Sequence, residues 1–466
     1  MDGITKHSRV SEDKASTQSR AGFAVLEILR RKVWGVRWYQ ALGWAGIHSL
    51  LGLVLSFVTI KFTAAYLGPS GIALVAQLGN FLVLCHGILG GGIGTATLRV
   101  YPEFGSDRAG RKRFLATTWR LGSLFAVVSI VTIALASGPL ARWLLTSDDH
   151  GTAMMLAGVA VACMVLNTVI MSAINAAGEM GRVVVSSAIT QVVAFAVYVP
   201  ASVVWGIPGG LIGFAISQSV CLPVSLAVLR WSSSVAPEDF RGPFDLTQAR
   251  RILSFVPMLI AHSIMSPLGL IMIRDMVASH LGLATAGLWQ ATWRISEIYL
   301  GIVIASLGLY FPTRLGEVVG TPELRPEIVR TFVRVVGITA AAALTIFLLR
   351  DWVVRIVFTE EFLPMRDLMP FQLLGDMLTV AGWPLAFVLV ALVRSHWYIA
   401  LQILTPAIYF GGALYLVPKF GARGVTWAYC LAGATYFAIS VFALRDVLFQ
   451  GSDGHSNSRG SGNLND

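Results

Sequence analysis

Three polar side chains interrupt an apolar segment in the second half of the chain and fall on one face of the helix expected there. Gln290 and Arg294 are four residues apart, and Glu297 follows three residues later. Residues with these spacings are neighbours on a helix surface. A charge deep in a membrane is costly and therefore faces an aqueous cavity or a partner. The set indicates either a substrate-binding face or an Arg294–Glu297 ion pair that only orients packing.

Other charged residues lie within or beside apolar segments. Lys61 and Arg274 fall near expected outer ends of spans, where a long basic side chain can reach headgroups as well as a ligand. Asp376 has no basic neighbour within a helical turn, so it needs a proton, a cation or a partner such as Arg294 on another helix. Asp376 is thus the candidate for proton or sodium coupling. The candidate substrate-binding residues are Arg294, Gln290, Glu297, Arg274 and Lys61.

The composition is that of an all-α integral membrane protein. Of the 466 residues, 55% are hydrophobic and 13% are charged, whereas a soluble protein carries about 25% charged residues. Twelve apolar blocks are long enough to cross the hydrocarbon as helices, which leaves little chain for a separate enzyme domain. The predicted spans are 41–61, 71–95, 119–145, 152–176, 183–205, 209–230, 251–273, 284–311, 331–350, 368–391, 397–417 and 424–444.

Short stretches of similar residues in the first half recur about 214 residues later, in the same order. A duplicated membrane protein usually holds its substrate between the two halves, near the midplane. The repeats predict a transporter with a first six-helix bundle at 41–230, a cytoplasmic linker at 231–250 and a second bundle at 251–445. The matched stretches are Leu67-Gly68 and Gln77 with Leu281-Gly282 and Gln290, Arg142–Thr146 with Arg355–Thr359, and Gly206–Gly209 with Gly421–Gly424.

The basic residues predict the orientation. With a cytoplasmic N-terminus, the inner segments hold 26 Lys and Arg residues and the outer segments hold eight, so both termini are expected in the cytoplasm. The net charge of +10 is therefore a topology signal and does not indicate nucleic-acid binding. Residues 1–40 are expected to form a basic arm with an interfacial helix, and 446–466 a disordered polar tail.

Other chemistry has little support in the sequence. All four cysteines fall inside predicted spans and are interpreted as packing residues. The glycine-rich stretch 90–94 follows no strand and lacks the Gly-Lys-Ser/Thr of a phosphate-binding loop. No nucleophile–base set, metal site or cofactor motif is recognisable. An enzyme is not expected, and an ATP-driven pump would need a separate motor subunit.

Three segments carry a family resemblance. Segments 281–300 and 350–376 resemble the corresponding regions of Wzx-type oligosaccharide-lipid flippases, which serve O-antigen or enterobacterial common antigen (lipid III) synthesis. Tyr66–Gly71 is similar to the Leu-Gly-Pro-x-Gly turn seen widely in the multidrug/oligosaccharidyl-lipid/polysaccharide exporter (MOP) superfamily. The resemblance covers about residues 41–445.

The resemblance implies two six-helix bundles in a V, with a cavity that opens alternately to each side of a bacterial inner membrane. It implies transport of undecaprenyl diphosphate bearing a short glycan to the periplasmic leaflet, for surface polysaccharide synthesis with a polymerase and a chain-length regulator as partners. Arg294 would meet the diphosphate, because guanidinium groups bind such oxygens in bidentate fashion. Gln290, Glu297, Trp289 and Trp293 would meet the sugars.

Two alternative functions remain. A cation-coupled multidrug antiporter of the same fold is expected to carry carboxylates deep in its first bundle, and spans one to six here contain none. A membrane-bound glycan polymerase or ligase would act on the same lipid-linked sugars, but such enzymes typically carry a large periplasmic loop. The longest outer loop expected here is near 350–367.

Overall fold

A computed structural model of the chain describes residues 51–449, which fold into helices without a strand in that range. The predicted basic arm at 1–40 and most of the polar tail lie outside the described residues. The helices are Leu51–Leu89, α2 Gly91–Val100, α3 Arg108–Leu135, α4 Ser137–Leu145, α5 Gly151–Ala176, α6 Met180–Ser219, α7 Cys221–Arg230, α8 Leu246–Leu253, α9 Val256–Leu281, α10 Leu283–Val318, α11 Leu324–Leu348, α12 Arg350–Val357, α13 Met369–Ala391, α14 Ser395–Phe420, α15 Ala422–Ala443 and α16 Arg445–Phe449, with short 3-10 turns at Tyr101–Phe104, Asp148–His150, Pro237–Arg241 and Glu360–Asp367.

Ten helical segments within 51–449 are long and apolar enough to cross a membrane. Two of them are unusually long, Leu51–Leu89 and Met180–Arg230, and each contains a glycine with positive φ, Gly68 and Gly206. Dividing these two segments at their glycines would give the predicted twelve spans, and that number stays a prediction. Many large apolar side chains are exposed, and Leu135 is exposed to 82%, as expected for a surface that faces lipid.

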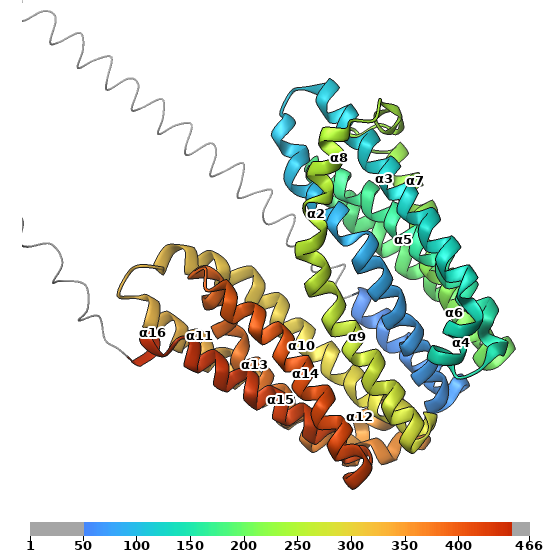
Figure 1. The fold of residues 1–466 in the computed structure, drawn as a ribbon. Helices are drawn as coiled ribbons and strands as arrows, with labels where there is room; N and C mark the ends of the chain where they lie inside the picture. Colours follow the sequence, from blue (N-terminus) through green and yellow to red (C-terminus); the bar gives the residue numbers. More distant parts are fainter. Residues whose placement is uncertain (1–50, 450–466) are drawn as a thin grey trace, which may run out of the picture.

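The two halves form the two arms of a V (Figure 1). The arms meet at the end where α4 and α12 lie, which we call the apex, and spread at the end of α8 and α16. At the apex, Gly287 of the second half lies directly against the backbone of Pro69 in the first half. The architecture is thus the predicted all-α membrane protein with two bundles.

The predicted duplication is visible in the backbone. Gly68 and Gly282, which match in the sequence repeat, both have positive φ, at 64° and 88°. Gly206 and Gly421 have nearly equal dihedral angles of φ 58°, ψ −140° and φ 60°, ψ −145°. Glycine adopts such angles without the steric cost that a Cβ brings, so the repeated glycines mark equivalent turns.

Several helix boundaries differ from the predicted spans, and the third span and α9 show the differences that matter for the bundles. The third span, predicted at 119–145, begins earlier at Arg108, and the helix breaks at Ala136 before α4. Pro139 lies just after this break, and proline removes a backbone donor and clashes with the carbonyl four residues earlier. Helix α9, predicted to belong to the second bundle, packs against α2 of the first bundle as well as against α10 and α14.

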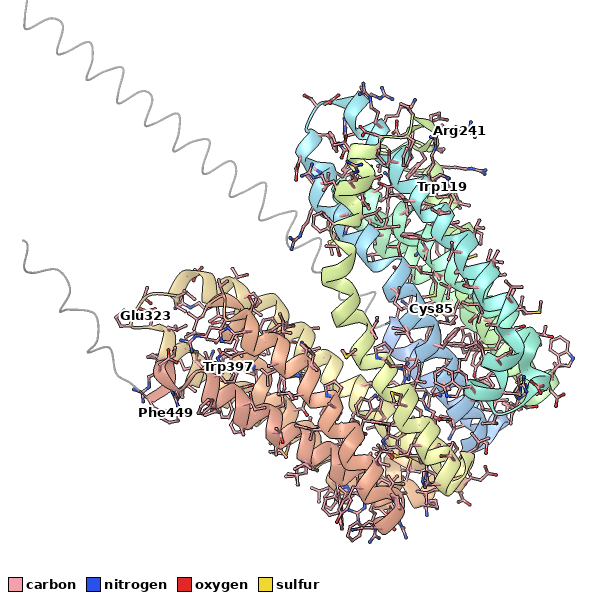
Figure 2. All side chains as sticks on the ribbon, viewed as in Figure 1. Cys85, Trp119, Arg241, Glu323, Trp397 and Phe449 are labelled. Atoms are coloured by element: carbon pink, nitrogen blue, oxygen red, sulfur yellow. The ribbon has the colours of Figure 1, made fainter. Side chains whose placement is uncertain are left out.

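Basic residues gather on the loops at the spread end. Figure 2 shows Arg241 at the tip of the first arm and Glu323 and Phe449 at the tip of the second. Arg108 and Arg111 line a small pocket together with residues 232–236 and Asp239, so they lie beside Arg241 at the tip of the first arm. The prediction that both termini are cytoplasmic therefore corresponds to a V that opens toward the cytoplasm.

Candidate functional site

A cavity of about 470 Å³ lies between the two arms near the apex, and we call it the central cavity. The first half contributes Thr59, Thr63 and Asn80, among others, and the second half contributes residues of α10. Three of the predicted substrate-binding residues, Gln290, Arg294 and Glu297, line its wall. Their helical spacing places them along α10, and the packing of the two halves places α10 at the interface.

Arg294 and Glu297 form an ion pair on this wall, with Nη1 of Arg294 at 2.8 Å from Oε2 of Glu297. The other guanidinium nitrogen donates to Ser56 Oγ at 3.2 Å, so Arg294 contacts both halves. Glu297 Oε1 accepts a hydrogen bond of 3.0 Å from Trp293 Nε1. The two side chains are 46% and 38% exposed, so both remain accessible from the cavity.

Arg274 lies at the closed apex and is 2% exposed. Its guanidinium donates to Gln77 Oε1 at 2.5 Å and also to the side-chain oxygen of Gln290. Gln77 and Gln290 are the matching glutamines of the sequence repeat, so one arginine joins equivalent positions of the two halves. Trp289 lies beside the group, with its ring centroid 5.8 Å from the guanidinium carbon.

Lys61 has a different environment from the other predicted binding residues. Its ammonium donates to the carbonyl oxygen of Arg355 at 2.9 Å and to that of Phe358. These carbonyls lie at the end of α12, where backbone acceptors lack partners within the helix and a cation is favourable. We therefore assign Lys61 to a helix terminus and leave it out of the proposed binding site.

Asp376 of α13 is fully buried. One carboxylate oxygen accepts hydrogen bonds from Ser296 at 2.6 Å and from Tyr299 at 2.7 Å, and the other accepts from Gln372 at 3.4 Å. In the part of the chain that the structure describes, no Lys or Arg pairs with Asp376. The alternative of an Arg294–Asp376 salt bridge is therefore not realised, because Arg294 pairs with Glu297 instead.

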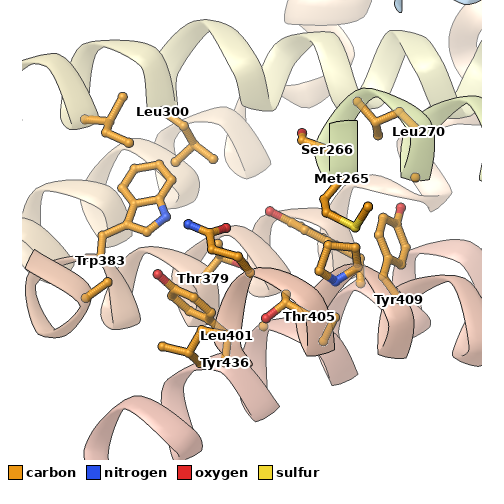
Figure 3. A pocket seen from close by; sticks show the side chains of 18 of the residues that line it. Met265, Ser266, Leu270, Leu300, Thr379, Trp383, Leu401, Thr405, Tyr409 and Tyr436 are labelled. Carbon is orange, nitrogen blue, oxygen red and sulfur yellow. The ribbon is translucent and has the colours of Figure 1, made fainter. Parts of the chain in front are cut away.

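A second, larger cavity of about 760 Å³ lies within the second bundle, and we call it the aromatic pocket. Met265, Ser266 and Leu270 of α9 lie on one side of it, and Thr405 and Tyr409 of α14 lie on another (Figure 3). Glu297, Ser266 and Leu270 line both this pocket and the central cavity. The two cavities are thus neighbours across α9 and α10.

The aromatic pocket is not apparent from the sequence. Its side chains look like packing residues because they are spaced along apolar helices, although Gln402 and Thr405 on one face of α14 are an available signal. Of the tryptophans expected near sugars, Trp293 lines the pocket, whereas Trp289 is completely buried. The role of Gln77 is not apparent either, because its contact with Arg274 depends on how the halves pack.

Sequence comparisons agree with this architecture. A family profile described as polysaccharide biosynthesis protein matches residues 40–314. The Lipid III flippases of Escherichia coli (strain K12) and Shigella flexneri are each 22% identical to this chain over 398 residues. The aligned region covers 85% of this chain and 95% of each relative.

Solved structures of the MOP superfamily share the fold. A multidrug resistance MATE family transporter in an inward-facing conformation has a TM-score of 0.74 at 14% identity, covering 85% of this chain and 94% of that one. The Lipid II flippase MurJ in an inward closed conformation has a TM-score of 0.68 at 12% identity, covering 87% of each chain. An outward-facing MATE family structure scores lower, at 0.62 with 14% identity, covering 87% of this chain and 94% of that one.

Proposed function

The chain belongs to the polysaccharide biosynthesis protein family, and from that premise we propose that it is a flippase for an undecaprenyl-diphosphate-linked oligosaccharide. The substrate moves from the cytoplasmic to the periplasmic leaflet of a bacterial inner membrane, for surface polysaccharide synthesis. The relatives named as lipid III and lipid II flippases support this class of substrate. The observation that carries the proposal is an accessible arginine, Arg294, on the wall of a cavity between two bundles.

The chemistry of the substrate explains why the cavity needs a cation. A diphosphate and its sugars cannot enter hydrocarbon without losing their hydration, so the protein has to supply polar partners along the path. A guanidinium group is always charged and matches phosphate oxygens with two parallel N–H donors. The prenyl chain stays in the lipid, which already solvates it. Arg294 is the diphosphate ligand in this proposal.

Glu297 orients Arg294 while the cavity is empty of substrate. The pair is partly exposed, and ion pairs of that kind contribute only about 0–1 kcal/mol to stability. A diphosphate that offers more oxygens and more charge can therefore take over the guanidinium at small cost. Glu297 keeps its bond from Trp293 when Arg294 changes partner.

Transport by alternating access requires the apex to open while the spread ends close. Opening would separate Arg274 from Gln77 and Gly287 from Pro69. We propose that Asp376, a buried carboxylate with only neutral donors among the described residues, couples this change to a proton or a sodium ion. A polymerase and a chain-length regulator would then act on the flipped product.

The second candidate function is cation-coupled multidrug export. The MATE structures share the fold, but at 14% identity this likeness concerns the fold alone. The predicted spans of the first bundle contain no carboxylate. The carboxylate of Glu297 on the wall of the central cavity is already paired with Arg294, and this exposed pair leaves the guanidinium open to exchange with an incoming anion. An anionic substrate fits that wall better than a cationic drug.

Deletion of the gene tests the proposed function. We expect undecaprenyl-linked oligosaccharide to accumulate in the cytoplasmic leaflet, measured by leaflet-specific chemical labelling of the glycan in sealed vesicles. Plasmid-borne wild-type protein should restore the periplasmic pool, and Arg294→Ala should not. Unchanged lipid-linked sugars together with altered drug resistance would overturn the flippase in favour of the multidrug exporter.

A further inference from the structure

We propose that the aromatic pocket of the second bundle binds the glycan of the substrate, and that this glycan is uncharged. The inference rests on the proposed function and adds a subsite to it. The pocket lies next to Arg294, because Glu297, one helical turn away, lines both cavities. A diphosphate on Arg294 would thus present its first sugars to the mouth of this pocket.

The wall of the pocket carries polar groups that have no partner within the protein. The hydroxyls of Tyr398, Thr405 and Tyr436 and the amide of Gln402 line the pocket and make no hydrogen bond to another described residue. These four side chains are half-buried and face the pocket, so at membrane depth water or a ligand has to supply their hydrogen-bond partners. Sugar hydroxyls are the ligand groups that would satisfy a row of donors and acceptors of this kind.

Aromatic rings complete the wall. Trp383 points into the pocket between α10 and α14, and Tyr436 and Tyr409 lie along its other walls (Figure 3). Trp and Tyr combine a flat apolar face with a polar group at the ring edge. A pyranose has the same two properties, an apolar C–H face and a rim of hydroxyls. The volume of about 760 Å³ lies within the range of about 300–1,000 Å³ that is usual for small-molecule sites.

The charge of the pocket selects among glycans. Among the described residues that line it, Glu297 alone is ionisable as an acid or a base at neutral pH, and no Lys or Arg is present. A uronic acid placed there would lose hydration without gaining a counter-charge and would meet the Glu297 carboxylate. An uncharged hexose or an N-acetylated hexose meets no such cost.

A prenyl chain is a poorer occupant than a glycan. It would fill the apolar part of the pocket but leave Gln402 and the three hydroxyls unpaired. The chain also gains little by leaving the bilayer, since lipid tails are as apolar as the pocket. The prenyl chain is therefore an outcome that the experiment has to exclude.

The experiment measures binding of defined lipids to the full-length protein in lipid nanodiscs. The probes are undecaprenyl diphosphate alone, the same lipid with a disaccharide of uncharged hexoses, and the same lipid with a hexuronic acid as its second sugar. The variant is Gln402→Leu with Tyr436→Phe, which removes polar groups while keeping volume. The matched control is Tyr415→Phe, a 64% exposed tyrosine of α14 outside the pocket.

We expect the uncharged disaccharide to tighten binding to the wild-type protein about tenfold over the bare lipid, which is the effect of one or two net hydrogen bonds. The double variant should lose this gain and bind the bare lipid as before, while Tyr415→Phe keeps the gain. The hexuronic acid should bring less gain than the neutral sugar. Equal binding of bare and glycosylated lipid by the wild-type protein would overturn the glycan subsite.

Two further outcomes distinguish a wrong assignment of the glycan subsite from a wrong proposed function. If the double variant weakens the bare lipid as much as the glycosylated lipid, the pocket holds the prenyl chain and the inference is wrong. If undecaprenyl diphosphate does not bind, or binds equally to Arg294→Ala, the proposed function fails together with the subsite. Loss of the sugar gain in the double variant, with Arg294-dependent binding of the bare lipid retained, supports both.

Discussion

At the scale of single residues, Arg294 is held by partners that it can exchange. Its bonds to Glu297 and Ser56 fix the guanidinium without burying it, and the same wall is open to the central cavity. Arg274 is the opposite case, an arginine enclosed by amides at the apex. The protein thus uses one arginine at an accessible site and another at a closed contact between the halves.

Substitution of Arg294 should separate charge from geometry. Arg294→Ala is expected to lower affinity for undecaprenyl diphosphate by about 10- to 100-fold, because hydrogen bonds to charged groups contribute about 1.5–3 kcal/mol. Arg294→Lys keeps the charge but loses the two-pronged geometry, so its affinity should be intermediate. The measurement is lipid binding together with the leaflet distribution of the lipid-linked glycan.

The control for a purely structural role is the pair of changes Arg294→Ala and Glu297→Ala. If Arg294 only neutralises Glu297, the double variant should recover much of the loss, since no unpaired charge remains. Equal expression of the single and double variants, measured in purified membranes, makes the comparison valid. Recovery of export by the double variant would reject the binding role.

The charge of Asp376 should be needed for export and not for folding. Asp376→Asn keeps the shape and can still accept hydrogen bonds from Ser296 and Tyr299, so the protein should remain folded in the membrane. Export should fall strongly, because the amide carries no charge and takes up no proton. The readout is glycolipid export at several external pH values and sodium concentrations, and full activity at all of them would exclude a required charge.

Some of the site could be predicted from sequence, and the reason is local geometry. The shared face of Gln290, Arg294 and Glu297 follows from helical spacing alone, and all three line the central cavity. The partners of Asp376 could not be predicted in the same way, because Ser296 and Tyr299 lie about 80 residues earlier in the chain. Contacts of that kind depend on how α10 and α13 pack.

At the scale of helices, the duplicated turns were predictable and the helix break at Ala136 was not. Hydropathy blocks predict spans because an apolar length is required to cross the hydrocarbon. The same signal continues through Ala136 into α4, so it cannot locate a break that the Gly138-Pro139 pair causes. Repeated glycines such as Gly206 and Gly421 are a better guide, since their backbone angles are specific.

Glu179, in the turn between α5 and α6, should make the stability of the neighbouring segment depend on pH. Burial raises the pKa of Glu179, but hydrogen bonds from Arg182, Ser233, Ser232 and Ser234 outweigh it and lower the pKa to about 2. A carboxylate with a lowered pKa stabilises the fold above its unfolded pKa and loses that effect as pH falls toward the folded value. At pH 7, Glu179→Gln should therefore lower the free energy of local opening of the segment after α7 by about 2 kcal/mol.

Hydrogen exchange of residues 232–236 measures this effect. The amides should exchange faster in Glu179→Gln than in the wild-type protein at pH 7, and the difference should shrink between pH about 4.5 and about 2, where the wild-type carboxylate takes up its proton. Glu238→Gln, an exposed neighbour in the same linker, is the control and should exchange as the wild-type protein does. An unchanged rate in Glu179→Gln at pH 7 would contradict the assignment.

At the scale of the whole molecule, the uneven distribution of Lys and Arg predicts which way the V opens. Reporter fusions after Gly206 and after Arg445 should report periplasm and cytoplasm respectively. Gly206 lies at the apex side, because Leu67 packs against Gly210 in the next turn. Helix α16, which begins with Arg445, lies at the spread end. The opposite pattern would reverse the orientation and with it the direction of transport.

The close contact between Gly287 and Pro69 is needed for the apex to close, so a larger residue at Gly287 should shift the protein toward the state with an open apex. Gly287 lies against the Pro69 carbonyl with no room for a Cβ, so Gly287→Ala should destabilise the closed apex. A state in which the apex is open and the arm tips approach then gains population. Spin labels at Arg241 and Glu323, in a background without the native cysteines, should report a shorter distance in Gly287→Ala. Gly308→Ala, also on α10 but with open space around it, is the control and should leave the distance unchanged. An unchanged distance in Gly287→Ala would show that the apex is not a gate.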